Sequence, residues 1–171
     1  LPYNPALKPY EVAKDGKSSG TPDDMWAFTS RDPQRDFNAA TMFAAASHAL
    51  RGYNDALADR ALKQSKRLLK EATELMAKRP QNGNKSRSGA GGNISANLQL
   101  YVATGEQEYL DKFEAMLWPS LDRNVNRSLQ TALDAIPYLG EEYKEKLRPY
   151  VEEFKTFIED LEKDNPYGVP I

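Results

Sequence analysis

The sequence predicts an all-α fold of antiparallel helical hairpins. Six segments carry helical patterns of apolar residues, and the first four alternate between two kinds. The first and third have no charged residue within 38–50 and 94–103, whereas the second and fourth are apolar on one stripe only. A helix that is apolar all round is buried, and a one-sided helix faces water. The alternation predicts inner helices paired with outer ones, as in part of an α/α toroid.

Local start and stop signals bound the predicted helices. Asp32-Pro33 places an N-cap carboxylate before a proline at the first helical position. Asp55 can cap the second helix, and Thr104-Gly105 ends the third with glycine in the left-handed position. Pro149 is expected to kink or split the last helix. The expected helices are 33–53, 56–78, 94–103, 107–117, 124–135 and 141–163.

We expect one all-α domain or fragment over residues 1–171. It would have an irregular entry segment at 1–31, about six helices within 32–164 and an exit segment at 165–171. The second helix is expected to bury one stripe, formed by Leu57, Ala61, Leu68, Ala72, Leu75 and Met76.

The connections between helices are expected to alternate in length. Loops 80–93 and 118–123 are long, whereas the turns at Asn54 and Gly105 are short. Antiparallel stacking would place the longer connections at one end of the fold. We therefore expect a functional site at that end, because long loops have room to build one.

Composition excludes several classes of function. The chain has 171 residues, 40% of them hydrophobic and 28% charged, with a net charge of −2, which favours neither nucleic acid nor an anionic membrane as a partner. No apolar run approaches the roughly 20 residues that span a bilayer. The absence of cysteine excludes disulfides and thiolate chemistry. Because the chain begins at Leu1, we expect it to be a processed or excised piece, and its start does not indicate a compartment.

Three patterns that could carry chemistry favour structural interpretations. His48 is the one histidine, so a zinc site is not expected, and it is interpreted as a hydrogen-bonded core or edge residue. Residues 89–92 are glycine-rich, but no Lys-Ser/Thr follows them, which favours a surface loop over a phosphate site. Carboxylates near the first helix, including Asp32 and Asp36, could pair for glycoside hydrolysis, but Asp32 is expected to be a cap. No catalytic residue, metal ligand or cofactor is predicted.

Aromatic residues at the expected long-loop end are the candidate binding contacts. Trp26, Phe28 and Trp118 could stack on sugar rings, and simple packing is the alternative. Together with Arg31 they form the predicted substrate-binding set.

Four stretches resemble glycoside hydrolase family nine, the endoglucanase-like six-hairpin α/α barrels. Residues 37–46 are similar to the alanine-rich inner helix of that family, and 61–72 to its following outer helix. Residues 100–110 look like the next inner helix, turn and outer helix, and 165–171 like the segment before later active-site loops. Their order and spacing make the resemblance moderately specific over about residues 28–171.

The resemblance implies a fragment of an enzyme rather than a whole one. The family's upstream Asp-Ala-Gly-Asp motif and downstream acid are not in this chain, and Gly91-Gly92 stands where the family often has an acidic pair. The implied activity of the complete protein is inverting hydrolysis of β-linked glucan or a related polysaccharide. The implied location is periplasmic or secreted. The chain alone is predicted to be inactive.

The same resemblance implies partners. Six helices are about half of a barrel, so the chain is expected to pair with the remaining half or with another copy of itself. The alternative function is a non-catalytic helical-repeat module that binds protein or glycan.

Overall fold

The computed structural model describes residues 1–21, 31–78 and 90–163, and the chain divides into two compact units, 1–31 and 32–171. The described residues of the first unit contain no helix. Tyr3 and Val12 both form isolated backbone bridges with Ser19. Gly20 lies so close to the Lys8 backbone that a Cβ at this position would be 2.0 Å from the Lys8 carbonyl oxygen. Only glycine fits there without a shift of the backbone.

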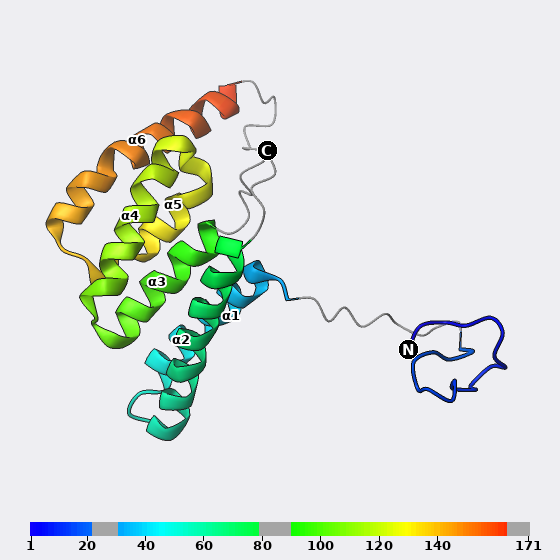
Figure 1. The fold of residues 1–171 in the computed structure, drawn as a ribbon. Coiled ribbons are helices and arrows are strands. Elements are labelled where there is room, and N and C mark those ends of the chain that lie inside the picture. Colours follow the sequence, from blue (N-terminus) through cyan, green and yellow to red (C-terminus); the bar gives the residue numbers. More distant parts are fainter. Residues whose placement is uncertain (22–30, 79–89, 164–171) are drawn as a thin grey trace. The chain divides into compact units, whose positions relative to one another are not determined.

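The second unit is all-helical in its described residues, as predicted (Figure 1). None of these helices is long and apolar enough to cross a membrane. The helices are α1 (Pro33–Leu50), α2 (Asp55–Lys78), α3 (Ala90–Thr104), α4 (Gln107–Arg123), α5 (Val125–Asp134) and α6 (Glu141–Lys163), with a 3₁₀ turn, η1 (Ile136–Tyr138), between α5 and α6.

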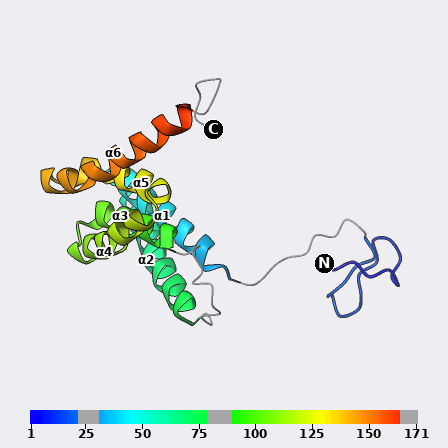
Figure 2. The ribbon, with the colours of Figure 1, turned by 90° about the horizontal axis from the view of Figure 1, so that it is seen from above.

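Helix α3 is the centre of the second unit. It packs against α1, α2, α4 and α5 (Figures 1 and 2). No described residue within 93–104 is fully exposed. Ile94 and Leu98 belong to a hydrophobic cluster with α4, α5 and α6. Ala96 and Leu100 belong to a second cluster with α1 and α2. The prediction that the charge-free segment 94–103 is interior is therefore confirmed.

Several predicted helix boundaries are confirmed by their hydrogen bonds. Asp32 caps α1, because its Oδ1 accepts a hydrogen bond from the Gln34 backbone N–H at 3.1 Å. Gly105 follows α3 with a φ of +69°, and its N–H donates to the Tyr101 carbonyl. These bonds satisfy backbone groups that a helix end leaves unpaired.

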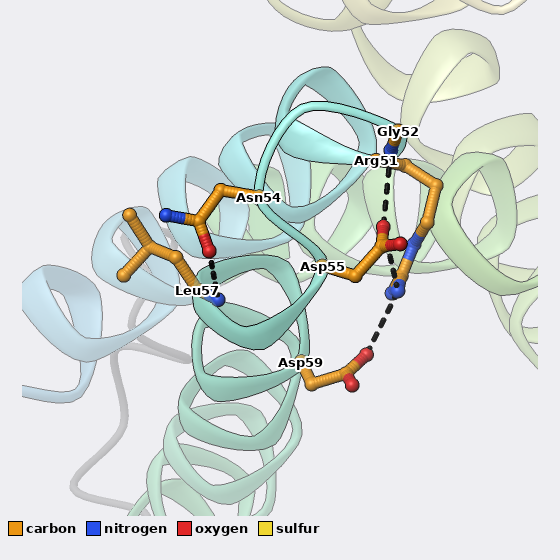
Figure 3. Close-up of polar contacts among 6 residues, drawn as sticks. All are labelled: Arg51, Gly52, Asn54, Asp55, Leu57 and Asp59. Carbon is orange, nitrogen blue, oxygen red and sulfur yellow. Dashed lines mark hydrogen bonds and ion pairs between the residues drawn. The ribbon is translucent and has the colours of Figure 1, made fainter.

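The turn between α1 and α2 is built differently from the prediction (Figure 3). Asn54, not Asp55, caps α2, since its Oδ1 accepts from the Leu57 N–H at 3.0 Å. Asp55 is the first residue of α2, and its Oδ1 accepts from the Gly52 N–H. Arg51 donates to Asp59 at 2.9 Å and so ties the turn to the next turn of α2.

Helices α1 and α2 meet through small side chains. The Ser65 hydroxyl of α2 is fully buried and donates to the Ala40 carbonyl of α1 at 2.7 Å. A side chain as short as serine reaches the other backbone only when the two helices lie close together. The buried residues of α1 are Pro33, Phe37, Ala40, Ala44 and Ser47, and those of α2 are Ala58, Ala61, Ser65, Leu69 and Ala72.

That buried stripe corrects the prediction for α2. Ala61 and Ala72 are buried as expected, but Leu57 is exposed and the predicted stripe left out Ser65 and Leu69. The close approach to α1 explains the difference, because it favours small residues over the large apolar ones that the pattern emphasised.

The prediction that segment 38–50 is buried all round is wrong. Only one stripe of α1 is buried, and Met42 and Phe43 are 72% and 40% exposed. Helices α2 and α3 cover one side of α1, and within the described residues the remaining side has no such cover.

The prediction that a loop occupies 118–123 is also wrong. Helix α4 continues through Pro119 to Arg123, and Asn124 alone joins it to α5. Pro119 has no N–H for the Ala115 carbonyl, but both residues are exposed, so water can hydrate that carbonyl. The burial of Leu117 and Leu121 stabilises the helix on either side of the proline. Helix α6 likewise continues through the exposed Pro149 and is not split.

Helix α3 begins earlier than predicted. It includes residues 90–92, which were expected to be loop, so Asn93 lies inside the helix. The rest of the predicted loop, 80–89, lies outside the described residues, as does the exit segment 165–171. The prediction that the longer connections gather at one end of the fold is wrong for the link between α4 and α5, because that link is a single residue.

The close α1–α2 contact predicts a steep cost for a larger side chain. Ser65→Leu should lower the free energy of unfolding by about 1–3 kcal/mol, because the extra atoms have no space between the helices. Gln64→Leu, at an exposed neighbouring position, should change it by less than about 0.5 kcal/mol. Urea denaturation followed by circular dichroism measures both. Equal effects of the two substitutions would contradict the close packing.

Candidate functional site

The structure does not test whether the four predicted contact residues meet in one site. Trp26 and Phe28 lie outside the described residues. Arg31 is exposed at the end of the first unit, whereas Trp118 belongs to the second unit. The grouping of these residues around a substrate therefore stays a prediction, and Trp118 is the member whose surroundings can be analysed.

Trp118 joins α4 to α6. Its ring lies 5.3 Å from the ring of Tyr143 and 6.1 Å from that of Tyr150, both on α6. The Lys146 ammonium, also on α6, lies 4.1 Å from the centre of the Trp118 ring. These contacts cover much of the indole and stabilise the packing of the two helices.

A cavity of about 380 Å³, here called the Trp118 cavity, opens beside this contact. Its walls come from the end of α3, one side of α4, η1 and the first turns of α6. The residues that line it are Tyr101, Leu110, Glu114, Trp118, Tyr138, Leu139, Gly140, Glu142, Tyr143 and Lys146.

Helical spacing explains most of this lining. Leu110, Glu114 and Trp118 are four residues apart on α4, so they share one face of the helix. Glu142 and Lys146 repeat the same spacing on α6. The cavity includes the turn at Leu139-Gly140, so it lies beside a short connection rather than at the long-loop end that was expected.

Tyr143 is the buried anchor of the cavity. Its hydroxyl donates to the Ala132 carbonyl at 2.8 Å. Burial, and secondarily the negative charge of Glu114, raise the pKa of Tyr143 well above its usual range. Tyr150 nearby donates to Asp122 at 2.5 Å, and that hydrogen bond is the main cause of its own raised pKa.

The cavity offers polar groups that make no hydrogen bond or ion pair within the described part of the chain. They are the carboxylates of Glu114 and Glu142 and the hydroxyls of Tyr101 and Tyr138. Tyr138 is 45% exposed. Carboxylate acceptors, hydroxyl donors and a partly exposed aromatic residue together suit a neutral polyhydroxylated ligand.

The other motifs of the sequence take structural positions. His48 is exposed near the end of α1, so it is an edge residue and not a core residue. Asp32 is the expected cap. Within residues 1–21, 31–78 and 90–163, no group of three His, Asp or Glu side chains could hold a metal ion.

Sequence reasoning found Trp118 but missed its neighbours. Tyr138, Glu142 and Lys146 follow α5 in the sequence, and their meeting with Trp118 depends on how α6 returns along α4. Only part of this arrangement had a local signal in the sequence. Ile136-Pro137 ends α5 as expected, and it places Tyr138 in the 3₁₀ turn.

Comparison with protein family models, with curated proteins and with solved structures finds no match for this chain. The geometry of the described residues is therefore the basis for any functional conclusion.

The raised pKa of Tyr143 predicts a loss of stability in alkali. Since the folded protein holds this phenol neutral, its contribution is complete below the unfolded pKa of about 10 and is lost as the pH rises toward the higher folded value. Between about pH 10 and 11.5, Tyr143→Phe should reduce the pH dependence of the unfolding free energy by up to about 1.4 kcal/mol per pH unit. Urea denaturation at several pH values measures this. An unchanged slope in Tyr143→Phe would contradict the prediction.

Proposed function

We propose that this chain is part of a family-nine-like glycoside hydrolase acting on β-linked glucan or a related polysaccharide, and that it contributes glycan binding rather than catalysis. The Trp118 cavity is the observation that carries this proposal. It combines an exposed aromatic ring with hydrogen-bond donors and acceptors that are not used within the described residues.

The chemistry of the cavity matches a sugar ring. Sugar hydroxyls both donate and accept, so they could donate to Glu114 and Glu142 and accept from the hydroxyls of Tyr101 and Tyr138. The apolar face of a pyranose could lie on the Tyr138 ring. Lys146 is exposed, so its side chain can swing away from Trp118 at small cost when a ligand enters.

One side of α1 is not covered by any other described helix, which supports the view that the chain is part of a larger helical assembly. Met42 and Phe43 are exposed on a helix without a charged residue from Phe37 to Leu50. A further hairpin beside α1 would bury this surface, as it would in a closed α/α ring. The catalytic carboxylates of the inverting reaction would come from segments beyond this chain.

A titration with cellohexaose tests the proposed glycan site. The chain should bind the oligosaccharide saturably in isothermal calorimetry, and Tyr138→Ala should weaken binding about fivefold, the loss expected for one aromatic contact. Tyr53→Ala is the matched control, since Tyr53 is 91% exposed in the turn between α1 and α2, away from the cavity.

Two results would contradict this proposal. One is the absence of saturable binding by the folded chain, and the other is equal weakening by the two tyrosine substitutions. Reducing-sugar release from a soluble β-glucan should stay at the background level. Turnover by the isolated chain would show that the catalytic groups are present after all.

A non-catalytic module that binds protein is the second candidate function. The exposed apolar side chains of α1 favour it, because such surfaces commonly mark protein contacts. Under this alternative the α1 surface would bind a partner protein instead of a missing hairpin.

Either function predicts that the α1 surface associates. In the absence of another partner, the chain should self-associate with increasing concentration in sedimentation velocity experiments. The double substitution Met42→Glu and Phe43→Glu should keep it monomeric, because burying two carboxylates is costly. Tyr53→Glu, on the neighbouring turn, should leave association unchanged. A chain that is monomeric at all accessible concentrations would contradict this prediction.

A further inference from the structure

The outward side of α2 carries a row of cations. Residues 60–70 contain five basic residues and no acidic one, although the net charge of the chain is −2. Four of the five are exposed and follow one another at intervals of three and four residues, which places them on one face of the helix. These four, here called the α2 basic stripe, are Arg60, Lys63, Arg67 and Lys70.

The α2 basic stripe lies on the side of the helix away from its packing partners. Helix α2 packs mainly against α1 and α3, and its buried residues include Ala61, Ser65 and Leu69. At 3.6 residues per turn these positions fall on the opposite face from the stripe. The stripe is therefore open to a partner in solution.

Several acidic side chains near the stripe are already paired with other cations. Asp55 and Asp59 bind Arg51 at 3.5 and 2.9 Å (Figure 3). Lys66, the remaining cation of the segment, binds Glu106 at 2.6 Å. These carboxylates are therefore engaged elsewhere and oppose the positive charge of the stripe only weakly.

Most of the stripe is not neutralised. Arg60, Lys63 and Lys70 make no ion pair or hydrogen bond within the described part of the chain. Arg67 binds Glu71 at 3.0 Å, so its charge is partly balanced. At 1.5 Å per residue the stripe spans about 15 Å of the helix axis, with neighbouring cations about 4.5–6 Å apart along it.

This arrangement suits a linear partner with several spaced negative charges. Exposed ion pairs contribute little one at a time, so a single small anion would bind poorly. A polymer that presents anions in a row combines these weak contacts.

A nucleic acid fits the stripe less well. Duplex DNA carries one charge per about 1.7 Å, which is much denser than the cations of the stripe, and the net negative charge of the chain opposes so dense a polyanion. Single strands bind through stacking on aromatic rings as well as through charge, and residues 56–78 contain no aromatic residue.

We propose that the α2 basic stripe binds an acidic polysaccharide, in which each sugar carries one carboxylate. The choice of a polysaccharide over an acidic peptide rests on the proposed glycan function, since both are linear anions. The stripe is separate from the Trp118 cavity, where Glu114 and Glu142 would repel such a ligand.

Two oligosaccharides of equal length and linkage test the proposal. A hexamer of β-1,4-linked glucuronate differs from cellohexaose in having a carboxylate on every sugar. In ¹H–¹⁵N spectra of the full chain at low salt, the glucuronate hexamer should shift the amides of residues 60–70 saturably, and cellohexaose should not. Its affinity should fall at least threefold when the ionic strength is raised from about 0.01 to 0.15 M, because the Debye length shortens from about 30 to 8 Å.

Paired substitutions separate the stripe from the overall charge of the chain. Lys63→Gln with Lys70→Gln should weaken binding of the glucuronate hexamer about fivefold, the loss expected for two exposed ion pairs. Arg148→Gln with Lys155→Gln is the matched control, since it removes two exposed cations, also seven residues apart, from α6. The control should change the affinity by less than about twofold, because distant exposed charges are screened. Circular dichroism checks that both variants are folded.

Several outcomes would overturn the proposal. They are the absence of glucuronate binding at low salt, equal weakening by the two paired variants, and equal shifts of residues 60–70 by cellohexaose. Tighter binding of hexaglutamate, or of an oligothymidylate of equal charge, would assign the stripe to an acidic protein or a nucleic acid instead. Glucuronate binding at the stripe without cellohexaose binding at the Trp118 cavity would support this inference and contradict only the proposed neutral glycan site.

Discussion

The second unit depends on the burial of α3 on two faces. Ile94 and Leu98 pack into the cluster with α4, α5 and α6, while Ala96 and Leu100 pack into the cluster with α1 and α2. Neither cluster is complete without this helix, and it is the main element that joins them. A helix without charged residues can do this because no face of it has to reach water.

The Trp118 cavity and a second cavity of about 610 Å³ between α2 and α4 arise from the way the surrounding helices pack around α3. Helices α2 and α4 leave a gap between them, and the remaining polar face of α3, with Asn97, closes it from below. On the other side, α6 approaches α4 through large aromatic rings, which cannot fill the space near the Leu139-Gly140 turn. In the cavity between α2 and α4, Glu108 is paired with Lys112, whereas Glu114 and Glu142 in the Trp118 cavity make no ion pair within the described residues.

The six helices could be predicted from their apolar patterns, and some of their ends could be predicted because the signals there are local. Asp32, Gly105 and Pro137 act through the backbone of their own turns, and the pattern of a few residues reveals them. The continuation through Pro119 could not be predicted, since it depends on the burial of Leu117 and Leu121 by other helices. For the same reason the sequence indicated Trp118 as a contact but not its meeting with Tyr138 and Glu142, which requires the return of α6.

The single-residue link between α4 and α5 restricts how this protein can vary. Asn124 has an extended backbone, and the hydroxyls of Ser120 and Ser128 lie 2.6 Å apart beside it. An added residue would separate these hydroxyls and shift α5 along the shared core. Insertions, fusion points and new chain termini should therefore be poorly tolerated here and better tolerated in the exposed turn that follows α1.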